Sequence, residues 1–449
     1  MDIVVEQLRR LGYLFYVVNP KTSSYETKEE VPDYLNQVVP YFLTLMLLEM
    51  LVLRFRSHNP VKFRLGDAMT SAGHGIIYTI TSSMTRGVEL VGYAWLYQRR
   101  LFDLDWNSSV TWWLAALGVD LGYYCVHRLV HEVSIGWAAH QVHHSSEEYN
   151  LSTALRQSVF QKFFAFGFYL PLALIGVPLP AILVHMQFNL LYQFWIHTEV
   201  VSTLGPLELV LNTPSHHRVH HGANPWCLDK NYAGVLIIWD RMFGTFEAER
   251  PKEKIIYGLV DQPQTFNVPW LQVFYYRDTF VKAAKQLTWA DTIKSLFYGP
   301  GWCPGSPRLG FPLPDSHNEP RKKYNPSLPA IVELYLFSHF LVTLYLQQVL
   351  LNNFNSHSCA SVLLHILYML VTLGNFGALY DGWRGAVLLE ALRCVAFLFW
   401  SVQSPLLGGG ALETSVRYYS AFSAVVWAGL ALFRDSLVIP PSGGKKKKQ

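Results

Sequence analysis

The sequence predicts an all-α integral membrane protein, a multi-span helical bundle with a histidine-rich di-metal site on its cytosolic face. The first reason is composition: of 449 residues, 51% are hydrophobic and 15% are charged, which is more apolar than a typical soluble protein. The second is that apolar stretches long enough to cross a ~30 Å hydrocarbon core recur along the chain. The third is that 11 of the 17 histidines lie between residues 127 and 221, at spacings that place them on helix faces.

Charge and cysteine content exclude other classes of protein. The net charge of +4 equals the four lysines of residues 445–448, so the remaining chain offers no basic face for nucleic acid. The five cysteines form no CxxC pair, which argues against a disulfide framework and against a thiolate metal site. Residues 1–38 form an N-terminal segment that lacks the continuous apolar core of a cleaved signal peptide.

Residues 39–250 are the predicted catalytic membrane domain. Residues 72–98 carry Arg86 and Glu89, so we expect two shorter helices there rather than one span. Pro178 and Pro180 interrupt the last apolar stretch of the domain, which predicts a helical hairpin that leaves and returns on the histidine side. The predicted spans of this domain are 39–55, 110–126, 160–177 and 181–196.

The second half of the chain begins with a polar region and ends in further spans. Residues 251–326 are amphipathic, and their aromatic and cationic side chains suit a helix lying in the membrane interface or the cytosol. Residues 327–435 form a predicted four-span region, and an even number of spans returns the chain to the histidine side. The four spans are 331–351, 359–379, 386–400 and 416–433.

Residues 436–449 are a predicted linker and lysine-rich tail. Lysines occupy the third and fourth positions from the end, a pattern that resembles the dilysine retrieval signal of endoplasmic reticulum membrane proteins. Because such a signal is read in the cytosol, it predicts an endoplasmic reticulum membrane protein whose tail and histidines face the cytosol. A plain solvated end or a contact with anionic lipid is the alternative.

The histidines fall into three groups with the spacing of metal ligands. Each group places its imidazoles three or four residues apart, on one face of a helix. Eight imidazoles are too many for one tetrahedral zinc ion, so two metal ions sharing a site is the economical interpretation. Nitrogen donors suit iron, copper or zinc without choosing among them. The groups are His127 and His131; His140, His143 and His144; and His217, His220 and His221.

Two further histidines in the hairpin compete for a place near this site. His185 and His197 are twelve residues apart, or about 18 Å along a helix, so only one can be close. His197 lies where the hairpin returns to the histidine side, and it is the one we expect to bind metal. His216 points about 100° away from its neighbour on a helix, which favours a supporting or surface role.

Four polar residues are candidates to support the ligands. Glu132 directly follows His131 and could orient a ligand imidazole or relay a proton, unless it is a solvated helix-end carboxylate. Asp120 lies two turns deeper in a span, where an ionisable group is functional by default, although it could instead bond a neighbouring helix. Asp229 and Asn231 could brace the third histidine group, or simply form a loop.

The three boxes HRLVH, HQVHH and HRVHH, in this order and between membrane spans, resemble those of the fatty acid hydroxylase superfamily of integral membrane di-iron enzymes. The likeness covers residues 105–247 and includes the phrases HHSSEEYNLSTALRQS and HHGANPWCLDKNYAGVLIIWDRMFGTF. It implies that the eight box histidines bind two iron ions and that His197 is the lone ligand between boxes. One departure is Gln193, where some relatives carry another histidine.

With its four later spans and its lysine tail, the whole chain resembles the branch of the superfamily that cleaves glyceryl ethers with tetrahydrobiopterin and O2. That resemblance implies an enzyme that hydroxylates the ether-adjacent carbon of an alkylglycerol taken from the bilayer. The resulting hemiacetal would break down to a fatty aldehyde and glycerol. Imidazole ligands suit this chemistry because thiolates would be oxidised.

Three alternatives remain open from the sequence. A sterol or fatty acyl hydroxylase or desaturase of the same superfamily would take its electrons from a cytochrome. A metal transporter or sensor would line a conduit with histidines, although here they gather at span ends. A structural multi-span protein would use them only for hydrogen bonds. Neither the pterin-binding residues nor the oligomeric state follows from the sequence.

Overall fold

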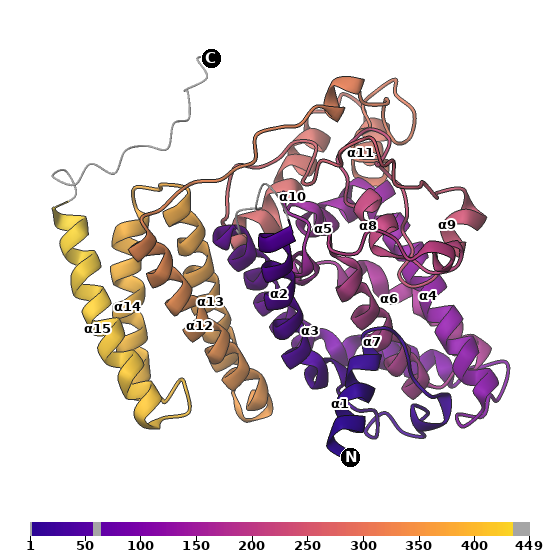
Figure 1. The fold of residues 1–449 in the computed structure, drawn as a ribbon, viewed down its shortest axis with the longest axis horizontal. Helices are drawn as coiled ribbons and strands as arrows, with labels where there is room; N and C mark the ends of the chain where they lie inside the picture. The colour runs from indigo at the N-terminus through magenta and orange to yellow at the C-terminus, as the bar shows by residue number, and fades with distance from the viewer. Residues whose placement is uncertain (1, 57–63, 434–449) are drawn as a thin grey trace. The chain divides into compact units, whose positions relative to one another are not determined.

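The computed structural model describes residues 2–56 and 64–433. Within these residues the secondary structure is α-helix with short 3-10 helices, and the only extended pairings are isolated bridges (Figure 1). The all-α prediction is therefore confirmed. The chain groups into two units, the first made of residues 1–63, 82–262 and 275–322, the second of residues 64–81, 263–274 and 323–449. Each unit thus combines segments that are distant in sequence.

The first unit contains the histidine boxes and is built around helix α4. Helix α4 packs against α5, α6 and α7. Its N-terminus is capped by Ser108, whose side chain accepts a hydrogen bond from the Val110 N–H. The helices of this unit are α1 (Asp2–Tyr13), α2 (Tyr34–Arg56), α4 (Ser109–Glu132), α5 (Ser134–His144), α6 (Lys162–Ile175), α7 (Leu179–Ile196), α8 (Pro214–His220), α9 (Ile238–Phe243) and α11 (Trp289–Phe297).

The predicted hairpin is present as α6 and α7. Helix α6 is capped by Gly176, whose φ of +102° lies in the left-handed region. A Cβ there would stand 2.0 Å from the Phe102 carbonyl oxygen. Only glycine fits this position. Pro178 then precedes the first turn of α7. This reversal directs the C-terminal end of α7, and with it His197, back to the end of α4 that carries the first box.

Helix α2 packs on α7 through one face and leaves the other uncovered. Val38 lies in the same core cluster as Phe188 and Leu191 of α7, and Leu45 packs against that cluster. On the opposite face Leu43, Leu47 and Leu51 are about half exposed, as a lipid-facing surface requires.

Two helices contribute residues to both units. Helix α3 (Leu65–Tyr97) is a single helix of 33 residues, so the expected pair of shorter helices within 72–98 is wrong. The reason is that no proline interrupts residues 65–97, and the charged residues Arg86 and Glu89 do not break backbone hydrogen bonding. Helix α10 (Val268–Ala284) is separated from α11 by the Thr288 N-cap, so the expected interfacial helix is in fact two helices.

Among the described residues, four helices are long and apolar enough to cross a membrane, which makes this a multi-pass membrane protein. They are residues 34–55 in the first unit and three helices of the second. The other predicted spans are also helical, but α6 is only 14 residues long, and length and composition alone do not qualify α4, α7 and α15.

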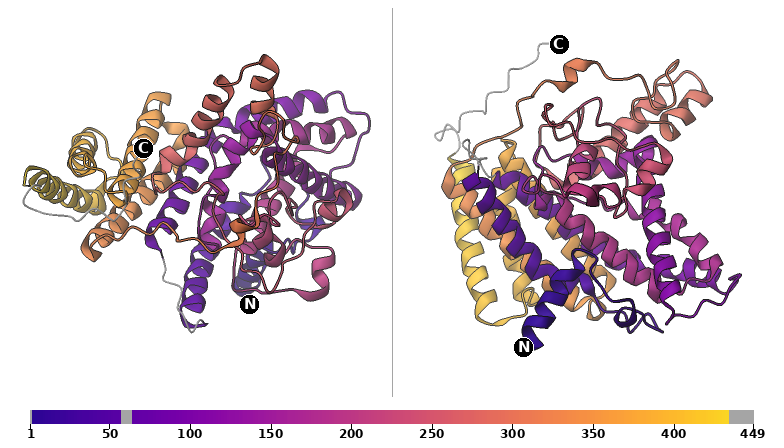
Figure 2. Two further views of the ribbon diagram at one scale, coloured as in Figure 1. Left: turned by 90° about the horizontal axis from the view of Figure 1, so that it is seen from above. Right: turned by 45° about the vertical axis from the view of Figure 1, so that its right-hand side comes forward.

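The second unit contains the four helices predicted for residues 327–435. They are α12 (Ala330–Asn352), α13 (Cys359–Tyr380), α14 (Ala386–Gln403) and α15 (Gly410–Leu432), and they lie side by side in every view (Figure 2). Helix α15 starts six residues before the predicted span. The lysine tail lies outside the described residues.

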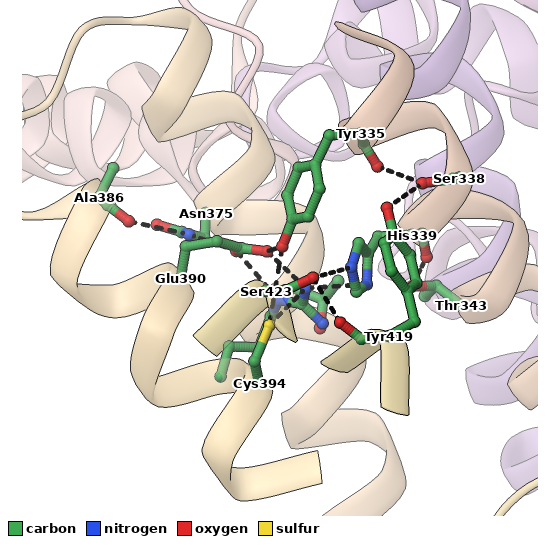
Figure 3. Close-up of polar contacts among 12 residues, drawn as sticks. Tyr335, Ser338, His339, Thr343, Asn375, Ala386, Glu390, Cys394, Tyr419 and Ser423 are labelled. Atoms are coloured by element: carbon green, nitrogen blue, oxygen red, sulfur yellow. Dashed lines mark hydrogen bonds and ion pairs between the residues drawn. The ribbon is translucent and has the colours of Figure 1, made fainter. Parts of the chain in front are cut away.

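A buried ion pair joins the helices of this unit (Figure 3). The carboxylate of Glu390 accepts hydrogen bonds from Tyr335 at 2.6 Å, Asn375 at 2.8 Å and the Arg393 guanidinium. Arg393 also donates to the Nδ1 of His339 at 3.1 Å. Because a buried ion pair is tolerated only when its hydrogen bonds are satisfied, this network constrains how α12, α13 and α14 pack.

Candidate metal centre

Helix ends deliver the predicted ligands to one place in the first unit. His127 and His131 lie in the last two turns of α4, and the second box closes α5. His197 is the residue after α7, and the third box forms α8 and its C-terminal cap. All nine of these histidines are buried, none more than 5% exposed.

Their ring nitrogens form two groups, and within each group the candidate ligand atoms lie within 4.8 Å of one another. The five-histidine group consists of His127, His131, His140, His144 and His220. The four-histidine group consists of His143, His197, His217 and His221. The second box contributes to both groups, because His143 and His144 are adjacent and point to different sides of α5. The structure therefore brings together every histidine that the sequence analysis selected.

The Nε2 atoms that face each other lie at hydrogen-bonding distance, so the positions of the ring protons decide whether these contacts attract or repel. In the five-histidine group, the Nε2 of His140 lies 3.0 Å from that of His127 and 3.2 Å from that of His144. In the four-histidine group, the Nε2 of His197 lies 3.0 Å from that of His217 and 3.2 Å from that of His143.

In each of four rings, the hydrogen-bond partner of Nδ1 determines which tautomer is present. The Nδ1 of His127 donates to the Tyr232 carbonyl at 2.7 Å, and that of His197 donates to the Gln193 carbonyl at 2.7 Å. The Nδ1 of His143 donates to the Arg156 carbonyl at 3.1 Å, and that of His220 to the Lys230 carbonyl at 2.9 Å. Carbonyl oxygens only accept, so each of these Nδ1 atoms carries the proton and each Nε2 is a bare lone pair.

Lone pairs that face each other at about 3 Å repel unless a cation lies between them. The contact between His143 and His197 has this form, because both of their Nδ1 protons are committed to carbonyls. Backbone carbonyls on the outer nitrogen are also the usual way in which proteins orient metal-bound histidines. The residues present therefore fit two metal ions, one in each group, with nitrogen ligands of the kind that suit iron, copper or zinc.

Burial keeps the imidazoles in their neutral form. Loss of solvation lowers the pKa of His140 to about 4 and that of His220 to about 3. The pKa values of His143 and His144 fall well below the usual range, because burial is reinforced by neighbouring imidazoles. Neutral imidazole is the form that binds metal, so the site is ready to accept cations near neutral pH.

The loop of residues 229–236 supports the five-histidine group. Asp229 and Asn231 both adopt positive φ, at +57° and +56°. The Asn231 side chain donates to the His216 carbonyl at 3.0 Å and to the Glu247 carbonyl at 2.7 Å, so it braces α8 directly. Asp229 Oδ1 lies 3.9 Å from Nδ1 of His131. Burial, together with the nearby charge of Glu132, raises the pKa of Asp229 to about 6.

Asp120 holds the far end of the same loop. Its Oδ1 accepts from the Val235 N–H at 2.8 Å, and its Oδ2 accepts from the Leu236 N–H and the Trp239 indole at 2.9 Å. The Asn189 side chain of α7 donates to it at 2.8 Å. Asp120 thus bonds a neighbouring helix, one of the two roles expected for it, and it also holds the segment that follows the third box.

Glu132 is engaged by two arginines. Its Oε1 accepts from Arg128 at 2.7 Å and its Oε2 from Arg308 at 2.8 Å. The first ion pair lies within α4, and the second joins the end of α4 to the segment that follows α11. The carboxylate is therefore saturated by cations, while Asp229 is the acidic group that lies beside the imidazole of His131.

The remaining sequence candidates lie away from the two groups. The Nδ1 of His185 lies 2.8 Å from the Tyr16 hydroxyl. The ring of His216 packs edge-on against Phe246. The side chain of Gln193 donates to Asn189 at 2.6 Å, and only its backbone carbonyl contacts a group member, His197.

Several supporting residues escaped the sequence analysis. The carbonyls of Arg156, Lys230 and Tyr232 carry no sequence signal, because every residue has one. Asp240, which accepts the N–H groups of Tyr232 and Ala233 at 2.8 Å, stands in the quoted phrase after the third box. Glu49 was detectable, because a carboxylate inside an apolar span is unusual.

Comparison with known proteins places this site in a family. The profile of the fatty acid hydroxylase family matches residues 112–245, and that of the alkylglycerol monooxygenase C-terminal domain matches residues 332–407. The chain is 45% identical to the alkylglycerol monooxygenases of Xenopus tropicalis, Danio rerio and Homo sapiens. The alignments cover 86%, 95% and 88% of this chain, and the same shares of those proteins. No solved structure matches it. The chain therefore belongs to the alkylglycerol monooxygenase family and is a membrane-bound oxidoreductase.

Proposed function

We propose that the protein is a tetrahydrobiopterin-dependent di-iron monooxygenase that hydroxylates the ether-adjacent carbon of 1-O-alkylglycerols with O2. The observation that carries this proposal is the presence of two histidine groups. Within the four-histidine group, the unprotonated Nε2 atoms of His143 and His197 face each other. The relatives are alkylglycerol monooxygenases, and their name indicates the substrate class. A soft thiolate site would not withstand the oxidant that such a reaction needs, whereas this donor set contains no sulfur.

Two iron ions held by these histidines would supply the reductive activation of O2, with two electrons from the reduced pterin. One oxygen atom enters the C–H bond next to the ether oxygen, and the other leaves as water with two protons. The product is a hemiacetal, so its C–O bond breaks as the new hydroxyl loses its proton and the glycerol oxygen gains one. Fatty aldehyde and glycerol result without a hydrolytic site.

The chain's own residues hold the ligands in the form that this chemistry requires. Carbonyls of Tyr232, Arg156 and Gln193 keep the Nδ1 protons in place. Asp229, beside Nδ1 of His131, would accept a hydrogen bond from that imidazole and strengthen it as a ligand. Glu132, held between two arginines, would act on the site by fixing the end of α4 rather than by exchanging protons.

The lipid substrate would reach the site from the bilayer. Its tail is already out of water there, so burying it gains little of the usual ~0.8 kcal/mol per methylene. Contacts to the glycerol head group would then set selectivity. We further propose that the protein resides in the endoplasmic reticulum membrane with the metal centre and tail facing the cytosol, on the basis of the lysine pattern of residues 445–448.

The test is an assay of aldehyde release from a glyceryl ether with and without added tetrahydrobiopterin, with iron measured in the same preparation. We expect two irons per chain and activity that depends on the pterin. Activity that instead requires reduced pyridine nucleotide and a cytochrome, on a sterol or fatty acyl substrate, would favour the other hydroxylases or desaturases of the superfamily.

A further inference from the structure

Glu49 is a buried carboxylate on the first membrane span, and neither the histidine boxes nor the proposed reaction accounts for it. It lies in the fifth turn of α2 and is 7% exposed. It continues the apolar face of α2 that packs against α7, following Phe42, Leu45 and Met46 at helical spacing. An ionisable group at this depth is costly and is kept for a reason.

The two carboxylate oxygens of Glu49 accept hydrogen bonds from two segments that are distant in sequence. Oε1 accepts the hydroxyl proton of Thr198, and Oε2 accepts the N–H of Leu151 at 2.8 Å. Thr198 directly follows His197. Leu151 begins a 3-10 helix, η2 (Leu151–Leu155), which starts seven residues after the second box.

Both segments continue to ligands of the four-histidine group. The residue that caps this 3-10 helix is Arg156, whose carbonyl accepts the Nδ1 proton of His143. On the other side, the carbonyl of Thr198 accepts from Arg218 at 3.0 Å. Arg218 lies between His217 and His220 on α8. Glu49 is therefore bonded to Thr198, the residue next to His197. It is also bonded to Leu151, the first residue of the short segment whose end contacts His143.

We infer that Glu49 is a positioning residue for the four-histidine group, which rests on the proposed metal centre. Its two hydrogen bonds hold the backbone behind His197 and behind His143 at a fixed separation. Without them, two buried donors would lose their partner and the segments would shift to find others. The five-histidine group has no ligand on either segment, apart from residues of the second box itself, so its affinity should change little.

The discriminating variants are Glu49→Ala and Glu49→Gln. Alanine removes both acceptors. Glutamine keeps one oxygen for the Leu151 N–H, and its amide can donate to the Thr198 hydroxyl, which can accept as well as donate. Iron binding is measured by titrating metal-free, detergent-solubilised full-length protein and by the Mössbauer spectrum of the loaded protein. Leu48→Ala, on the half-exposed face of the same helix, is the matched control.

We expect Glu49→Ala to weaken one of two iron-binding steps about 10- to 100-fold, the range for loss of hydrogen bonds that orient metal ligands. The other step, Glu49→Gln and the control should stay near wild type. Thr198→Val, which keeps the Leu151 contact, should weaken the same step if Glu49→Ala does not fold. Combined with Glu49→Ala, it should add little.

Three outcomes would overturn the inference. One is two unaltered iron-binding steps in Glu49→Ala. Another is Glu49→Gln behaving like Glu49→Ala, because a role in proton transfer or charge, not positioning, would then explain the residue. The third is an equal loss at both steps. A wild-type protein that binds no iron would instead refute the proposed function, so the two failures are distinguishable.

Discussion

Replacing Asp120 by asparagine should destabilise the protein strongly although the side chain keeps its shape. The carboxylate accepts four hydrogen bonds, two on each oxygen. An amide keeps one oxygen, so its NH2 group faces two donors that lose their acceptor. Each buried donor left unsatisfied costs about 1–3 kcal/mol, and the pair therefore costs about 2–6 kcal/mol.

This loss is large against the ~5–15 kcal/mol by which folded domains are stable. The lost hydrogen bonds also anchor the loop whose carbonyls orient His127 and His220, so the affinity for iron should decrease as well. The assay is denaturant unfolding of Asp120→Asn in detergent, together with iron content. Asp103→Asn is the control, because that carboxylate is 84% exposed and should change stability by no more than about 1 kcal/mol. Equal stability of wild type and Asp120→Asn would refute the reasoning.

Three further outcomes are expected. Gly176→Ala should lower the thermal midpoint, because alanine at a φ of +102° meets the Phe102 carbonyl; an unchanged midpoint would contradict the hairpin geometry. His144→Ala should abolish aldehyde release with at least one iron lost, and retained turnover would favour a purely structural histidine cluster. In metal-free protein, the folded pKa values of His140 and His220 lie at about 4 and about 3, below the usual ~6.5. The folded state then binds fewer protons than the unfolded one, so stability is full above pH 6.5 and is lost as pH falls toward 4; denaturant midpoints measured between pH 7.5 and 5 test this, and a flat profile would oppose it.

The histidine boxes were readable from the sequence because their spacing is a local property. Residues three or four apart share a helix face whatever the position of the helix in the fold, so the spacing of His140, His143 and His144 predicts that they act together. The choice of His197 over His185 followed from a similar argument about hairpin length and direction. The helical, multi-span character followed from composition and apolar run length.

The residues that support the histidines could be predicted only in part. Asp120, Asp229 and Asn231 stood out as polar residues near the boxes, but their partners did not. Glu132 was expected to act on the next-door imidazole, yet it pairs with Arg308, which is 176 positions away in the chain. The uninterrupted course of α3 also differed from expectation, because charged residues alone do not end a helix.

By itself the sequence predicted which nine histidines come together and that they lie at the ends of helices. Only the tertiary structure decided how nine imidazoles divide into groups of five and four, and which nitrogen of each ring faces its neighbours. That division depends on carbonyls and carboxylates brought in from distant segments, such as Tyr232 and Glu49. The physical reason is that helix periodicity orients side chains locally, whereas a tautomer is set by whichever acceptor the fold places against the other nitrogen.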